Sequence, residues 1–183
     1  MKKGLILLAA AVITSLTAFS QEDKKITKTA HINFFSHTSI EDISADNYSV
    51  VSSISPSTGA VVFSAPMQSF KFEKSLMQKH FNSKDFLDSK QFPKAKFKGK
   101  ISNVADVNFK KDGLYKVVFK GDLSLHGVTK SIAENGSIKI SKGKIIMKVN
   151  MKVALVDYKI SLKDGKPSNN VAKVIDVTVN AEY

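Results

Sequence analysis

The sequence contains no cysteine, no tryptophan and no arginine among its 183 residues. Without cysteine, the fold has no disulfide bond and the chain is not a lipid-anchored lipoprotein, so its stability must come from a hydrophobic core. Because all 28 basic residues are lysine, the chain lacks the planar guanidinium group that recognises phosphates and base edges through paired hydrogen bonds. We therefore expect no specific binding of nucleic acid.

Long apolar runs are also scarce. After the first twenty residues, no stretch approaches the roughly 18 apolar residues of a membrane-spanning helix. Residues 1–20 have the three parts of a secretory signal, which are Lys2 and Lys3, an apolar run, and Ala18-Phe19-Ser20 as a small-x-small cleavage site. We expect a signal peptide over residues 1–20, export to the periplasm, and a single domain over residues 21–183.

The formal net charge of +12 at pH 7 is large for a chain of this length. Two interpretations of so many lysines stay open. They can form a solvated surface that keeps strands from aggregating, or they can give a loose attraction to an anionic membrane surface. The oligomeric state cannot be predicted from these features.

The most regular pattern is an alternation of apolar residues with lysines in residues 144–155 and 94–101. Side chains on a strand point alternately to its two faces, so each segment has one apolar and one polar face. Such strands are typical of an antiparallel sheet with one face in water. The apolar members are Ile145, Met147, Val149, Met151, Val153 and Leu155 in the first segment, and Ala95, Phe97, Gly99 and Ile101 in the second.

Turn residues divide the chain into many short segments, which predicts an all-β domain. About eight strands with one apolar face can hide that face in two packed sheets or in a closed barrel, and closure also removes the edges. We expect strands within 26–38, 48–54, 60–65, 94–101, 104–109, 114–121, 144–155 and 171–181, with reversals at Ser55–Gly59, Asp112-Gly113, Asn135-Gly136, Lys142-Gly143 and Asp164-Gly165.

One segment breaks the strand pattern. Residues 72–81 contain no β-branched residue and place Phe72 and Leu76 at helical spacing, which predicts a short helix. The polar segment 82–93 that follows carries Phe86, Leu87 and Phe92. We expect the helix and this loop to cap one end of the barrel.

Residues that would indicate catalysis are few. No Gly-x-Ser-x-Gly motif is present to expose a nucleophilic serine. His31 and His37 lie about 20 Å apart along one strand, so they cannot share a metal ion. We expect no enzyme activity, no metal site and no cofactor. The alternative is an enzyme that uses histidines and acids near the barrel mouth, namely His80, Asp85, Asp88 and His126.

Large apolar side chains on the inward faces are the candidate ligand contacts. Unbranched methionines adapt to an irregular guest such as a lipid tail, although apolar side chains in a small domain also pack against one another without a ligand. His126 stands in a bend before Gly127, where it is either structural or in contact with a ligand headgroup. The candidate binding residues are Phe34, Phe63, Phe70, Phe97, Phe119, Leu123, His126, Met147, Met151 and Val177.

Two motifs carry a family resemblance. Residues 81–99, with Phe81-Asn82-Ser83-Lys84-Asp85-Phe86 leading to Phe97-Lys98-Gly99, and residues 121–130, with His126-Gly127-Val128-Thr129, resemble the YceI-like polyisoprenoid-binding family. The resemblance covers residues 26–181 and implies an extended, lipocalin-like antiparallel β-barrel that encloses a long-chain isoprenoid or fatty-acyl amphiphile in the periplasm. Residues 31–43 depart from the commoner family pattern, which leaves the identity of the ligand open.

Two other classes of protein remain as alternatives. One is a structural or stress-related interaction protein whose barrel is packed solid. The other is an outer-membrane barrel, because alternation does not say which face is inside and the chain has the aromatic Tyr183 at its end. The lack of tryptophan argues against the aromatic girdles of such a barrel.

Overall fold

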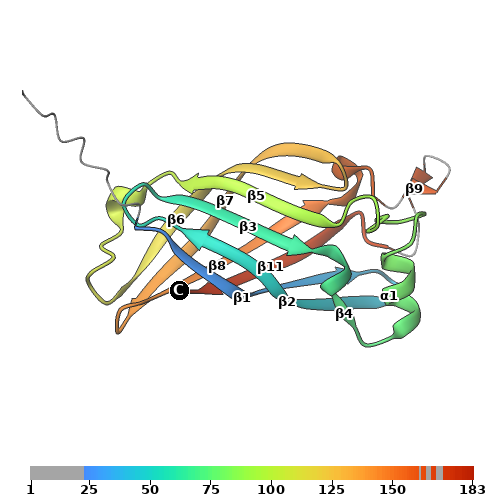
Figure 1. The fold of residues 1–183 in the computed structure, drawn as a ribbon. Coiled ribbons are helices and arrows are strands. Elements are labelled where there is room, and N and C mark those ends of the chain that lie inside the picture. Colours follow the sequence, from blue (N-terminus) through green and yellow to red (C-terminus); the bar gives the residue numbers. More distant parts are fainter. Residues whose placement is uncertain (1–22, 161, 164–165, 168–170) are drawn as a thin grey trace, which may run out of the picture.

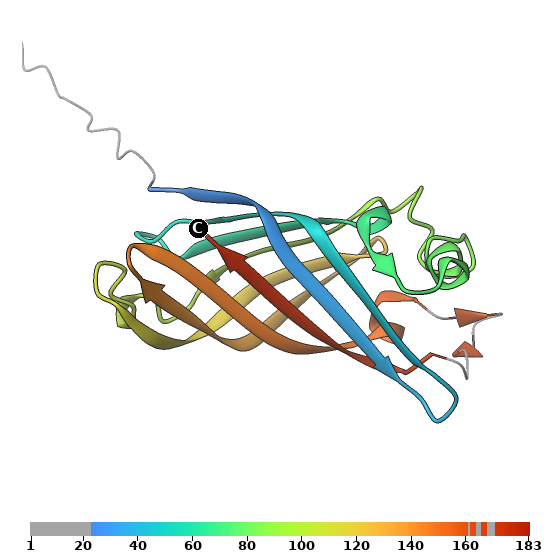
Figure 2. The same ribbon diagram turned by 90° about the horizontal axis from the view of Figure 1, so that it is seen from below.

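Eight antiparallel strands close into an elongated barrel in the computed structural model, which describes residues 23–160, 162–163, 166–167 and 171–183 (Figures 1 and 2). The strands follow the order β1-β11-β8-β7-β6-β5-β3-β2, and pairing of β1 with β2 closes the barrel. This confirms the predicted all-β, lipocalin-like barrel with one short helix. The predicted signal peptide, over residues 1–20, lies outside the described residues. No other domain boundary was predicted.

The main strands are β1 (Lys25–His37), β2 (Asp42–Ile54), β3 (Ala60–Pro66), β5 (Lys94–Ile101), β6 (Gly113–Leu125), β7 (Val128–Ser141), β8 (Lys144–Ala154) and β11 (Val174–Glu182). Three strands of two residues accompany them: β4 (Lys71–Phe72), which pairs with β2, and β9 (Leu162–Lys163) with β10 (Lys166–Pro167). The helical elements are α1 (Ser75–Phe81) and the short 3-10 helices η1 (Met67–Ser69), η2 (Val104–Asp106) and η3 (Leu155–Tyr158).

The alternation predicted from the sequence sets the two faces of the wall. On β8, Ile145, Met147 and Val149 are buried inside the barrel, whereas Lys144 and Lys148 are exposed. The strands β5 and β11 follow the same rule. The apolar faces of these strands therefore line the interior of the barrel, and their lysines lie on its outside.

Two tight reversals use left-handed backbone angles. His126 (φ 50°) and Gly127 (φ 74°) join β6 to β7, and Lys142 (φ 50°) and Gly143 (φ 79°) join β7 to β8. Positive φ at both central residues is the geometry of a type I′ hairpin, which glycine adopts without strain. The reversal predicted at Lys142-Gly143 is confirmed.

The reversal predicted at Asn135-Gly136 is wrong, because this pair lies within β7. A Cβ atom on Gly136 would come within 2.7 Å of both the Phe119 ring and the backbone oxygen of Lys148, so this glycine makes room for close neighbours instead of making a turn. The strand expected over residues 104–109 is also wrong, since this stretch begins with η2. The reversal expected at Asp164-Gly165 lies outside the described residues.

The helix α1 begins at Ser75, later than predicted, because Phe72 belongs to β4 and pairs with Ala45. The loop of residues 82–93 follows α1, and both lie at the same end of the barrel as β9 and β10 (Figures 1 and 2). The predicted cap of helix and loop is therefore present. None of the helices in the described part of the chain is long and apolar enough to cross a membrane.

The ladder between β7 and β8 is incomplete. Their pairing runs from Ser141–Lys144 to Gly136–Val149 and, within the described residues, no further. The short helix η3 follows β8 and lies against β7 beyond this point, where Lys130 Nζ is 2.8 Å from Asp157 Oδ1. The ring of His126 also reaches η3, with Nδ1 3.0 Å from the carbonyl oxygen of Tyr158.

Candidate binding cavity

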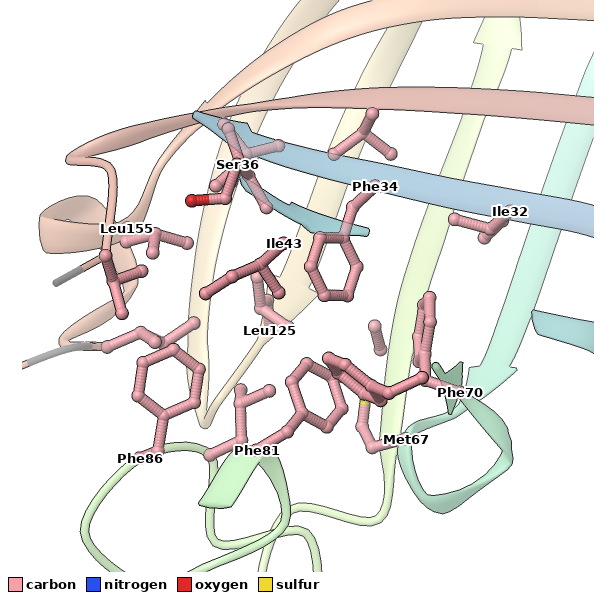
Figure 3. A pocket seen from close by; sticks show the side chains of 18 of the residues that line it. Ile32, Phe34, Ser36, Ile43, Met67, Phe70, Phe81, Phe86, Leu125 and Leu155 are labelled. Carbon is pink, nitrogen blue, oxygen red and sulfur yellow. The ribbon is translucent and has the colours of Figure 1, made fainter. Parts of the chain in front are cut away.

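A cavity of about 770 Å³ occupies the half of the barrel that is capped by α1 and the loop of residues 82–93. Its wall is made by the inward side chains of the strands that end there, including Ile32, Ile43, Leu125 and Ile175. Figure 3 shows several of these side chains pointing toward one shared space. The interior of the barrel is therefore hollow at its capped end.

Aromatic rings attach the cap to the wall. The ring of Phe81, at the end of α1, lies 5.6 Å from that of Phe34, 5.5 Å from that of Phe70 and 4.9 Å from that of Phe72, measured between centroids. Phe86 from the loop adds a fourth ring at 6.2 Å. Such tilted and offset pairs contribute about 0.5–1.5 kcal/mol each beyond the area that they bury. The cap is thus held by side-chain packing over the cavity (Figure 3).

The cavity ends at a layer of aromatic side chains near the middle of the barrel. Ala95 and Leu123 still line the cavity, whereas Phe97, the next inward residue of β5 away from the cap, and Phe119, two inward positions from Leu123 on β6, do not. A Cβ on Gly99 would lie 2.6 Å from the Phe97 ring, as one on Gly136 would meet Phe119. Glycines therefore leave space into which these rings fold, and the rings close the floor.

Polar side chains on the cavity lining gather near the cap. The polar members are Ser36, Glu41, His80, Ser83 and Asp85. Glu41 is already paired, since its Oε1 lies 2.8 Å from Lys74 Nζ. Within the residues that the structure describes, no group of three or more histidine, aspartate or glutamate side chains is placed to hold a metal ion. The arrangement provides an apolar interior with a small polar rim.

The structure separates the ten predicted binding residues into three groups. Five line the cavity: Phe34, Phe70, Leu123, Met151 and Val177. Four are not on its lining but lie in the floor layer and the filled half below it: Phe63, Phe97, Phe119 and Met147. The tenth, His126, is also absent from the lining; its ring packs edge-on against Phe92 at 4.6 Å and contacts η3. Contact of any of them with a ligand stays a prediction.

Other lining residues were not singled out from the sequence. Leu125 and Ile43 follow the same alternation as Leu123 and Ala45, so periodicity could have found them. Leu155 lies in η3 but continues the alternation predicted for residues 144–155, whereas Phe81 comes from α1, and its inward direction depends on how that helix folds back over the barrel end. No local sequence signal gives that direction.

The histidines and acids that were considered for a metal or catalytic site are not gathered in one place. His31 Nε2 lies 2.7 Å from Asp46 Oδ1, and its ring stacks on Tyr48 at 4.3 Å. His37 forms a separate exposed pair with Asp42. Of the four groups considered for a mouth site, the cavity lining includes His80 and Asp85 but neither Asp88 nor His126.

Burial is the main cause of a raised pKa at three groups, Glu134, Tyr158 and Tyr183. Burial raises the pKa of the Tyr183 phenol to about 12, although its hydrogen bond with the Ser52 hydroxyl acts in the opposite direction. Burial also raises the pKa of the Glu134 carboxyl, which lies on β7 beyond the last residue that pairs with β8. Tyr183 belongs to the filled half, where its backbone pairs with Ile145.

A closed antiparallel barrel of eight strands with an apolar cavity under a cap defines a lipocalin-like protein. Residues 19–183 match the YceI-like domain, and the chain belongs to this family. Among curated proteins, none matches the sequence.

Several solved structures share the fold. A polyisoprenoid binding domain from Saccharophagus degradans, described as implicated in plant cell wall breakdown, has a TM-score of 0.73 and 13% identity over 89% of this chain and 98% of its own. Burkholderia cenocepacia BcnA has a TM-score of 0.71 and 12% identity, with coverage of 84% and 96%. The Campylobacter jejuni YceI protein has a TM-score of 0.56 and 16% identity, with coverage of 100% and 92%.

Proposed function

We propose that the protein binds a long-chain isoprenoid or fatty-acyl amphiphile in the capped cavity, and that it carries or sequesters this ligand in the periplasm. The observation that carries the proposal is the apolar cavity of about 770 Å³ in the hollow half of the barrel. Its volume falls within the roughly 300–1,000 Å³ of typical small-molecule sites. Membership of the YceI-like family supports the proposal, as does the likeness to a domain described as polyisoprenoid binding.

Burial of the tail supplies the binding free energy. Each methylene group withdrawn from water contributes roughly 0.8 kcal/mol, so a hydrocarbon tail needs few polar contacts. The ligand's polar end lies at the rim with Ser83 and Asp85, and its tail points toward the floor at Phe97. Binding alone accounts for this arrangement, and we propose no catalytic step, metal or cofactor.

The proposed location rests on the first residues of the chain. Their basic start, apolar run and small-x-small site have the form of an exported protein's signal peptide. N-terminal sequencing of the protein from the periplasmic fraction tests this proposal. A protein that begins near Gln21 is expected, and an uncleaved chain in the cytoplasm would contradict it.

Ligand binding is tested first on the protein purified from its own envelope fraction. Native mass spectrometry is expected to show a bound species that moves into organic solvent and has the mass of an isoprenoid or acyl lipid. A protein that carries no extractable lipid and takes up no fluorescent lipid would contradict the proposal.

A pair of charge variants locates the binding site. Met151 lines the cavity, whereas its neighbour Asn150 points outward and is exposed. Met151→Lys is expected to abolish uptake of a fluorescent lipid because it places a charge among apolar side chains. Asn150→Lys adds the same charge to the outer wall and is expected to leave uptake unchanged. Circular dichroism verifies that both variants fold.

A further inference from the structure

The outer face of β5 carries a straight row of four exposed lysines: Lys94, Lys96, Lys98 and Lys100. Alternate residues on a strand are about 6.6 Å apart, so this lysine row extends over roughly 20 Å of the barrel wall. The inward residues between the lysines fix which face of the strand is outside, because Ala95 lines the cavity and Phe97 packs against the core. The lysines are therefore held on one side of the barrel.

The lysine row differs from the lysines on the outer face of β8. There, Lys144 Nζ lies 2.5 Å from Glu182 Oε1 and Lys152 Nζ lies 2.6 Å from Asp176 Oδ1, so the neighbouring β11 neutralises two of three charges. On β5, no ion pair involves the row in the part of the chain that the structure describes. The residues opposite the row on β3 are Ala60, Val62, Ser64 and Pro66.

The other neighbour of β5 offsets at most one charge of the row. On β6, Lys100 lies directly opposite Lys120, and two like charges at opposed positions destabilise a sheet. The single acid, Asp122, lies opposite Lys98, but its Oδ1 accepts a hydrogen bond from the Ser131 hydroxyl at 2.6 Å. An outer face selected for stability alone would pair its charges as β8 and β11 do.

We propose that the lysine row docks the protein on the surface of an anionic lipid bilayer. Lysine is a point charge on a flexible stem and suits the diffuse charge of lipid headgroups, whereas recognition of individual phosphates favours the arginine that this chain lacks. The row is continuous with the cap, because the loop of residues 82–93 leads directly into β5 and carries the exposed Lys84 and Lys90. Docking through β5 therefore brings the capped end of the cavity to the membrane.

The proposal is tested with two triple variants that remove the same charge. One replaces Lys96, Lys98 and Lys100 with Gln, and the other replaces Lys144, Lys148 and Lys152 with Gln. Binding to vesicles of phosphatidylcholine with and without phosphatidylglycerol is measured by co-sedimentation. We expect the unaltered protein to bind only the anionic vesicles and to be released by salt.

The β5 triple variant is expected to weaken binding to the anionic vesicles roughly a hundredfold, since each lysine near the surface contributes about 1 kcal/mol. The β8 triple variant is expected to remain within a few-fold of the unaltered protein. Equal losses would show that only the overall charge matters and would overturn the proposal. Failure of the unaltered protein to bind anionic vesicles would also overturn it.

Two controls make these outcomes distinct. Both triple variants are expected to keep their circular dichroism spectra and their uptake of a fluorescent lipid, because all six side chains are exposed outside the cavity. Heparin serves as a soluble polyanion. If the β5 triple variant loses binding to heparin but not to vesicles, the row serves a different partner and the proposal is wrong.

Discussion

The two halves of the barrel follow the same alternating pattern but differ in what they enclose. In the half away from the cap, which we call the filled half, Ile138, Ile145 and Met147 are at most 2% exposed and do not line the cavity. In the capped half, inward residues such as Ile32 and Ile175 are only partly buried because they border the cavity. Alternation thus decides which face is inside, whereas side-chain volume and the spacing of the strands decide whether the interior is filled.

The largest expected effect is a difference in the free energy of unfolding between one substitution in each half. Ile138→Ala, in the filled half, is expected to lower the free energy of unfolding by about 2–5 kcal/mol, because it leaves a void in a close-packed core. Ile175→Ala removes a similar side chain from the edge of an existing cavity and is expected to cost clearly less. Denaturant unfolding measures both, and equal losses would contradict the division into a filled and a hollow half.

A second prediction concerns the filled half at alkaline pH. The folded state raises the pKa of Tyr183 from 10.0 to about 12, so the unfolded chain loses this proton first. The stability linked to Tyr183 is complete below pH 10 and is lost as the pH rises from 10 to 12, by about 3 kcal/mol in all.

The matching variant is Tyr183→Phe, which has no group to ionise. Its free energy of unfolding is expected to fall less than that of the unaltered protein between about pH 9 and about pH 12. Near neutral pH it is expected to be less stable by about 1 kcal/mol, because the hydrogen bond with Ser52 is lost. Parallel losses in the two proteins with rising pH would show that Tyr183 is not protected by burial.

A substitution in the floor of the cavity tests where the hollow half ends. Phe97→Leu shortens a ring in the floor and is expected to favour tails longer by a methylene or two, each improving binding about fourfold, which corresponds to roughly 0.8 kcal/mol. Ile145→Val removes volume deep in the filled half and is expected to leave the preferred tail length unchanged. Competition with a series of alcohols of increasing length measures the preference, and an unchanged optimum for Phe97→Leu would contradict the assignment of the floor.

The smallest effect is expected at Glu134, on the side of the wall where β7 and β8 are not paired. Because burial raises the pKa of this carboxyl above 4.5, its ionisation destabilises the fold as the pH rises through the folded value. Glu134→Gln is expected to be slightly more stable than the unaltered protein at neutral pH and equally stable well below pH 4.5. A variant that is less stable at neutral pH would show that the carboxylate makes a favourable contact.

Much of the fold could be predicted from the sequence because alternation is a local signal. The inward direction of Met147 and Val177, the turn at Lys142-Gly143 and the cap after Phe72 all depend on neighbouring residues. The role of Gly136 was wrongly predicted because its reason is the ring of Phe119, which is remote in sequence.

The extent of the cavity was less predictable than the fold. Phe97 and Met151 look equivalent in the sequence, since each is a large inward residue between lysines or polar residues. The structure places one in the floor and the other on the lining. The difference arises from the depth of each residue along a closed barrel, which depends on the register of all eight strands.

The interrupted ladder between β7 and β8 gives the wall a seam. Up to Gly136 and Val149, parting β7 from β8 means breaking a run of backbone hydrogen bonds, whereas beyond these residues the described contacts across the seam are the ion pair of Lys130 with Asp157, the His126 contact and the packing of η3. Side chains therefore govern how readily the barrel parts along this line. Amide protons that border the seam are expected to exchange with solvent before those of the fully paired strands, so local breathing of this wall can proceed while the rest of the barrel stays closed.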